Sequence, residues 1–69
     1  MKVKAKYNEE QIRSVGIEIA SLWGGECLSY EVVKENGETI YRFMCIEHGD
    51  EFFTDVKESE IETDYAYCL

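Results

Sequence analysis

Two adjacent glycines, Gly24 and Gly25, separate a segment with helical periodicity from a segment rich in strand-forming residues. Before them, apolar or small side chains recur at intervals of three and four residues, which is the period of one face of a helix. This stripe consists of Ile12, Val15, Gly16, Ile19, Ala20 and Trp23. Asn8 followed by Gln11 is typical of a capping box, and Gly24 is typical of a left-handed C-terminal cap. We therefore expect a helix over residues 9–23 whose stripe faces the core.

The segment after the glycines contains runs of β-branched and aromatic residues separated by turn signals. Residues 27–33 and 39–46 are two such runs, and Asn-Gly at 36–37 between them is typical of a two-residue hairpin turn. A third strand is expected over residues 51–56, after a turn at 47–50. These elements predict an antiparallel sheet with the helix packed on one face.

The two ends of the chain also alternate between residue types. Val, Ala and Tyr alternate with Lys over residues 2–7, which predicts a half-buried strand with a basic outer face. In the tail, residues 57–69, acidic residues alternate with others over 58–65, which favours a strand, although a short acidic helix is the alternative. The expected fold class is α+β, one helix packed on a small antiparallel sheet in the order β-α-β-β-β. We expect a single domain over residues 1–69, because no linker or repeat is visible.

Charge and size exclude several classes of function. The chain has 69 residues and a formal net charge of −8, and an acidic surface repels the phosphates of DNA, RNA and anionic lipids. The 45% apolar content is too high for a disordered acidic tail. No apolar run is long enough for a signal peptide or a membrane span, and three widely spaced cysteines favour reduced thiols or metal ligands. A cytoplasmic location, with no direct nucleic acid or membrane partner, is the expectation.

The negative charge is concentrated in the last third of the chain. Residues 47–69 contain eight acidic residues and one basic residue, whereas residues 1–25 contain three acidic and four basic residues. If residues 58–64 were extended, their carboxylates would lie about 6.6–6.8 Å apart on one face. Two such rows of carboxylates could imitate the phosphates along a DNA backbone. The partner expected is a basic protein, and the candidate contact residues are the carboxylates Glu47, Asp50, Glu51, Asp55, Glu58, Glu60, Glu62 and Asp64, with Phe52 and Tyr65 as apolar anchors.

In composition and size the chain resembles phage DNA-mimic proteins, which occupy the DNA groove of a host protein. That resemblance implies a non-enzymatic inhibitor of a host DNA-binding or defence protein, present in the host cytoplasm. The alternative is that the acidic face is solvated and only keeps a small protein soluble.

A possible metal site lies near the expected turn at 47–50. Cys45 and His48 form a Cys-x2-His pair followed by Gly49, and a turn of this kind can direct two ligands at one zinc ion. With Leu28-Ser29, Phe52-Phe53 and a late cysteine, residues 25–68 resemble short zinc-ribbon repeats of phage and homing-endonuclease-associated proteins. The resemblance implies Cys45, His48 and Cys68 as zinc ligands, with Tyr65 in place of the fourth. Cys27 or Asp64 could supply that ligand.

Other roles for these residues stay open. Cys27, Cys45 and Cys68 can be small buried apolar residues, and His48 can be a turn residue. A Cys-His pair for nucleophilic catalysis lacks a third orienting group, so no enzyme is expected. Ile17 falls on the polar face of the expected helix, where it is either a single exposed apolar residue or a contact with a partner or a second copy in a homodimer.

The function expected is binding and inhibition of a DNA-binding protein by an acidic face that mimics DNA. The alternative is a degenerate zinc-ribbon module with a structural metal and a regulatory binding role.

Overall fold

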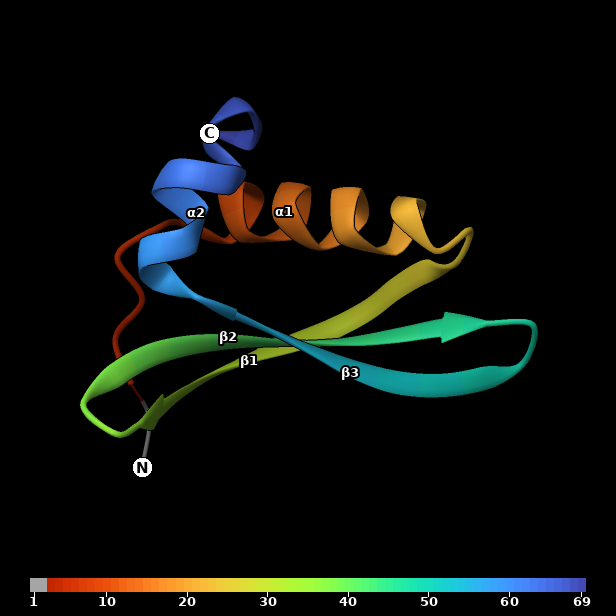
Figure 1. Cartoon of the computed structure of the whole chain (residues 1–69), viewed down its shortest axis with the longest axis horizontal. Coiled ribbons are helices and arrows are strands. Elements are labelled where there is room, and N and C mark those ends of the chain that lie inside the picture. The colour runs from red at the N-terminus through yellow and green to blue at the C-terminus, as the bar shows by residue number, and fades with distance from the viewer. Residues whose placement is uncertain (1–2) are drawn as a thin grey trace.

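The computed structural model describes residues 3–69 and contains a three-stranded antiparallel sheet with a long helix across one face (Figure 1). Helix α1 spans Glu9–Leu22, and the strands are β1 (Glu26–Glu35), β2 (Glu38–Glu47) and β3 (Asp50–Lys57). Helix α2 (Glu58–Asp64) and a single 3-10 turn, η1 (Ala66–Cys68), follow β3. The predicted α+β class is confirmed, with the observed order α-β-β-β-α. Among residues 3–69, neither helix has the length and apolar character needed to span a bilayer.

Helix α1 begins as the sequence predicts. The Asn8 side chain accepts a hydrogen bond from the Gln11 amide at 2.9 Å, and the Gln11 side chain accepts one from the Asn8 amide at 3.0 Å. The helical stripe is buried, except that Trp23 is 60% exposed. The prediction that Trp23 joins the core is wrong, because the helix ends at Leu22 and Trp23 leaves helical geometry at φ −102° and ψ 0°.

Two tight turns of the same kind fix the sheet. Asn36 and Gly37 have φ values of 51° and 79°, and His48 and Gly49 have φ values of 52° and 83°. Two successive left-handed residues form the type I′ turn, whose twist matches that of the strands it joins. The predicted hairpin at 36–37 is confirmed, and the sheet order is β1-β2-β3.

The core lies between α1 and the inner face of the sheet. The central strand β2 contributes Tyr41, Phe43 and Cys45, each with no exposed surface. The stripe of α1 packs on these side chains, and Val56 of β3 and Ile61 of α2 complete the cluster. Both helices pack on this face, so the alternate side chains of the strands, which point to the other face, carry no helix (Figure 1).

The two ends of the chain differ from the sequence-based expectation. Residues 3–7 form no strand, and Lys2 of the expected strand at 2–7 lies outside the described residues. The alternation does correspond to alternating burial, but Ala5 and Tyr7 pack against the core from an irregular segment that does not join the sheet. The tail is helical over 58–64, and the Glu60 carboxylate accepts a hydrogen bond from the Lys57 amide at 3.2 Å as its cap.

Candidate functional site

Two of the predicted partner-binding carboxylates hold the N-terminal segment in place. Glu58 accepts hydrogen bonds from the Lys6 amide, at 3.2 Å, and from the Tyr41 hydroxyl. Glu62 forms an ion pair with the Lys6 ammonium and accepts a hydrogen bond from the Tyr7 hydroxyl at 3.0 Å. We call Lys6, Tyr7, Glu58 and Glu62 the N-terminal clamp. Its carboxylates already have partners within the chain, so they are poor candidates for contact with another protein.

Electrostatics within the clamp follow from these contacts. The hydrogen bonds from Lys6 and Tyr7 lower the pKa of the Glu62 carboxyl. The Glu62 carboxylate in turn raises the pKa of Lys6. Burial raises the pKa of the Tyr41 hydroxyl, and the neighbouring Glu58 carboxylate raises it further. Each shift favours the protonation state that makes the contact at neutral pH.

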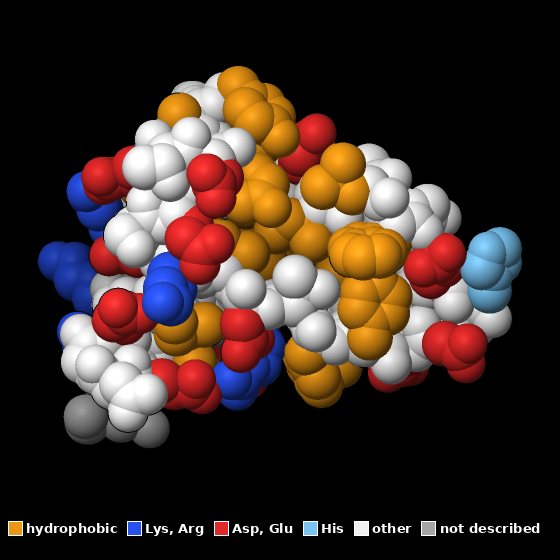
Figure 2. Space-filling model, viewed as in Figure 1, with side chains coloured by type: hydrophobic (Ala, Val, Ile, Leu, Met, Phe, Trp, Pro, Cys, Tyr) orange, Lys and Arg blue, Asp and Glu red, His pale blue; other side chains and the backbone are white. Residues whose placement is uncertain are grey.

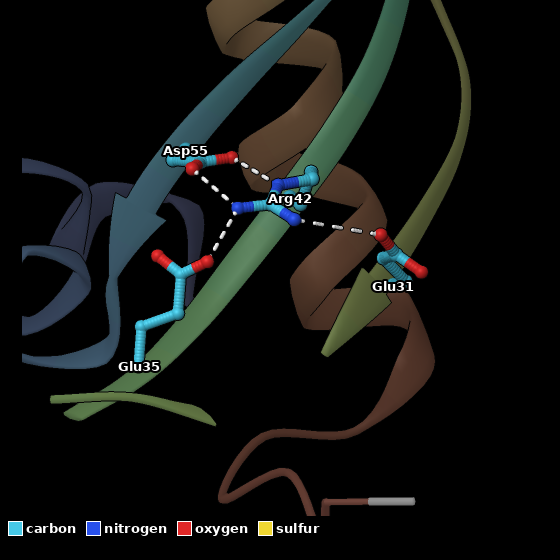
Figure 3. A network of polar contacts seen from close by, with 4 residues as sticks. All are labelled: Glu31, Glu35, Arg42 and Asp55. Carbon is cyan, nitrogen blue, oxygen red and sulfur yellow. Dashed lines mark hydrogen bonds and ion pairs between the residues drawn. The ribbon is translucent and has the colours of Figure 1, made fainter. Parts of the chain in front are cut away.

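Asp55 is neutralised by a second network, on the uncovered face of the sheet (Figure 3). Nε and Nη2 of Arg42 donate to the two oxygens of the Asp55 carboxylate at 2.8 and 2.9 Å. Nη2 also donates to Glu35 at 2.8 Å, and Nη1 lies 3.9 Å from a Glu31 oxygen. The Arg42 hydrogen bonds lower the pKa of Asp55. Arg42 and Asp55 are opposite each other in the β2–β3 register, and a two-fold hydrogen bond adds geometric specificity to that pairing.

The predicted row of carboxylates over 58–64 does not form. This segment is helix α2, and in a helix the side chains of alternate residues point to different sides. Glu60 caps the start of this helix, and Asp64 is exposed at its end. The phosphate-like spacing that an extended tail would provide is therefore absent from residues 58–64.

A different group of carboxylates has no Lys or Arg partner within residues 3–69. Strand register brings Glu26 of β1 and Glu51 of β3 to either side of Ile46, and Glu47 lies opposite Asp50 at the second turn. We call Glu26, Glu47, Asp50 and Glu51 the acidic tip. Among residues 3–69, none of the four is paired with Lys or Arg, and Glu47 lies 3.7 Å from the His48 ring. Sequence reasoning missed Glu26, which only the register of β1 on β2 could have placed there.

An apolar hollow adjoins the acidic tip. It is lined by Trp23, Phe52 and Thr54, with Glu47 at its edge, and we call it the Trp23 hollow. Figure 2 shows apolar side chains gathered in a band on this side of the molecule, with acidic side chains beside the band toward the β2–β3 turn. Leu22, next to Trp23, is 68% exposed. The hollow thus brings an exposed indole next to Glu47, one carboxylate of the acidic tip.

The two predicted apolar anchors have different environments. Phe52 is half-buried and lines the Trp23 hollow. Tyr65 packs against the core, and burial raises its pKa. Tyr67, whose ring lies 6.4 Å from that of Tyr65, is the more exposed of the two tyrosines. Trp23 was missed as an anchor, because its spacing fits the buried stripe of α1.

The proposed zinc ligands are not brought together. Cys45 is buried in β2 opposite Cys27, the His48 side chain is 87% exposed in the second turn, and Cys68 lies in η1. Among residues 3–69 no group of three or more His, Cys, Asp or Glu side chains is placed to hold a metal ion. His48 occupies a turn position, and Cys45 is a core residue, as the alternative interpretation describes.

No protein-family model matches the chain, and neither a curated protein nor a solved structure matches it.

Proposed function

We propose that this chain is a non-enzymatic binding protein that uses the acidic tip and the Trp23 hollow together to hold a basic protein. The observation behind this proposal is the exposed Trp23 side chain, which lines one hollow with Glu47, a carboxylate that has no Lys or Arg partner among residues 3–69. The two features supply complementary parts of a binding surface. The carboxylates attract cationic residues, and the indole offers an apolar area for them to cover.

The chemistry of the surface favours arginine-rich partners. A guanidinium can form two parallel hydrogen bonds with Glu47 or Asp50, which lie on the same face of the sheet as Phe52, and can stack on the Trp23 ring. Tryptophan and arginine are also the residue types that most often dominate binding energy at interfaces. Charge attraction of this kind speeds association and weakens as salt is added.

The partner class we propose is a DNA-binding protein, which the chain would inhibit by presenting carboxylates where that protein expects phosphates. Support for this class comes from the net charge of −8 and from the four carboxylates of the acidic tip. Helix α2 contributes no regular row of charges, so the acidic tip is the part of the surface that would replace phosphate.

A capture experiment tests both parts of the proposal. The immobilised chain is incubated with a bacterial lysate at about 50 mM and about 300 mM salt, a range over which charge screening rises strongly. Bound proteins are identified by mass spectrometry for the native chain, a Glu47→Gln/Asp50→Asn/Glu51→Gln variant and Trp23→Ala. A matched control, Glu10→Gln/Glu31→Gln/Glu38→Gln, removes the same charge from exposed positions elsewhere.

The expected result is a basic protein that binds the native chain and the matched control, dissociates at high salt and is lost from the other two variants. Equal capture by the acidic-tip variant, or capture of acidic proteins only, would contradict the proposed surface. Added duplex DNA separates the two parts: release by DNA supports a DNA-binding partner. If DNA does not compete, the DNA-mimic part is wrong and the basic-partner part stands.

A further inference from the structure

Cys27 and Cys45 lie directly opposite each other on β1 and β2. Both thiols are free, and both side chains belong to the face that α1 covers. Cys45 is fully buried, whereas Cys27 packs against the core and keeps partial exposure. We propose that these two residues are a redox modification site, a dithiol that closes to a disulfide when the protein meets a small disulfide such as glutathione disulfide.

The register brings the two cysteines within the range that a disulfide requires. Residues directly opposite each other in antiparallel strands have Cα atoms about 4.5–5.5 Å apart, and disulfides form between Cα atoms about 4.4–6.8 Å apart. The register shifts next to Cys27, where Leu28 is the extra residue of a β-bulge. Since a bulge relaxes the local ladder, β1 has freedom to adjust as the sulfur atoms meet.

The surroundings of the two thiols give them different roles. Cys27 lines a hollow between α1 and β1, together with the exposed side chains of Ile17 and Leu28, so a small disulfide can reach it from solvent. Cys45 has no exposed surface and is reached through Cys27. Burial raises the pKa of both thiols, and the adjacent Cys27 raises that of Cys45 further. We therefore expect slow closure at neutral pH.

The reaction proceeds by two exchanges. The Cys27 thiolate attacks one sulfur of glutathione disulfide, which forms a bond between Cys27 and glutathione, breaks the original S–S bond and releases one glutathione thiolate. The Cys45 thiolate then attacks the Cys27 sulfur, which forms the Cys27–Cys45 bond and releases the second glutathione. The two protein thiols lose two electrons and two protons, and one glutathione disulfide is reduced to two molecules of glutathione.

The test uses a Cys68→Ser chain, which keeps only the proposed pair. The folded protein is incubated with glutathione disulfide, quenched in acid, and analysed by intact mass and by trypsin digestion. Cleavage after Arg13, Lys34, Arg42 and Lys57 leaves Cys27 in peptide 14–34 and Cys45 in peptide 43–57. We expect a mass loss of about 2 Da, for two hydrogen atoms, and a cross-link between those two peptides.

The pH dependence and two variants complete the test. The closure rate should rise about tenfold per pH unit and continue to rise past the ordinary thiol pKa of about 8.5, because the thiolates react and both pKa values are raised. Cys45→Ala should stop at the glutathione adduct on Cys27, and Cys27→Ala should stay unmodified because Cys45 is buried. A lasting glutathione adduct in the Cys68→Ser chain, no reaction at about pH 9, or equally fast closure in urea would overturn the proposal.

Discussion

The Arg42 guanidinium holds the Asp55 carboxylate with two hydrogen bonds, of 2.8 and 2.9 Å, across the β2–β3 pair. The contact lies on the sheet face that carries no helix, so it is partly open to water. It joins two strands whose register the His48-Gly49 turn also sets. Local turn geometry and this cross-strand pair therefore specify the same alignment.

Replacing Asp55 with asparagine should lower the midpoint of urea denaturation modestly at neutral pH. Arg42 lowers the pKa of Asp55, so the folded protein favours the charged carboxylate. The resulting stabilisation is present above the unfolded pKa of about 3.9 and is lost as the pH falls through the lower folded value. The difference in urea midpoint between the native and Asp55→Asn proteins should therefore vanish in acid.

Glu31→Gln, which removes the longer contact of 3.9 Å to Arg42, is the matched control and should change the urea midpoint little. An Asp55→Asn deficit that persists in strong acid would contradict the electrostatic explanation.

Adding one methyl group to α1 should destabilise the protein. A Cβ atom at Gly16 would lie 2.8 Å from Cys27 Sγ and 2.9 Å from Cδ1 of Phe43, whose ring is fully buried. Overpacking of this kind costs about 1–3 kcal/mol, whereas the gain in helix propensity from glycine to alanine is about 1 kcal/mol. We expect Gly16→Ala to lower the free energy of unfolding, measured by urea titration.

Ser14→Ala serves as the control for that change, because Ser14 is exposed on the same helix. It should change the free energy of unfolding by less than about 0.5 kcal/mol. A stabilised Gly16→Ala protein would show that Phe43 and Cys27 move aside at little cost, which contradicts a tightly packed contact between α1 and β2.

The His48→Asn change should stabilise the second hairpin. His48 has φ 52°, and asparagine tolerates this left-handed conformation better than histidine does. We expect the free energy of unfolding, measured by urea denaturation, to rise by a few tenths of a kcal/mol and by at most about 1 kcal/mol.

The same variant tests the zinc prediction. If His48 is a structural ligand, adding zinc will stabilise the native chain and His48→Asn will be less stable than the native chain when zinc is present.

Removing the Tyr41 hydroxyl should weaken the attachment of α2 to the sheet. Tyr41 donates to Glu58, and among residues 3–69 Tyr41→Phe leaves that carboxylate with the Lys6 amide as its one hydrogen-bond donor. A hydrogen bond to a charged group contributes about 1.5–3 kcal/mol, and partial exposure of Glu58 to water reduces that value. A double-mutant cycle of Tyr41→Phe with Glu58→Gln should give a coupling energy above about 0.5 kcal/mol. Strict additivity would show that the two side chains do not interact in solution.

The central part of the fold follows from local sequence signals. The helix start at Asn8, the hairpin at 36–37 and the three strands after Gly25 are set by capping, turn chemistry and strand propensity, all of which act over a few residues. Such signals can be recognised in one sequence, because their physical causes lie within the segments that show them.

The parts that could not be predicted depend on contacts between distant segments. Apolar and basic residues alternate over 3–7 as they would in a strand. These residues pack against α2 and the core, and the sheet consists of β1, β2 and β3 without them. Glu58 and Glu62 resemble free charges in sequence until the fold brings Lys6 and Tyr7 to them. The same holds for the acidic tip, where Glu26 meets the second turn only through strand register.

The N-terminal clamp has a consequence for the order of folding. The two turns of the sheet close very short loops, whereas the Lys6–Glu62 contact joins residues 56 positions apart. Loop-closure entropy makes a contact at such separation slow to form compared with a two-residue turn. We expect the three-stranded meander to be structured in the folding transition state and the clamp to form afterwards. Amide hydrogens of α2 should then exchange with solvent sooner than those of β2, through openings that leave the sheet intact.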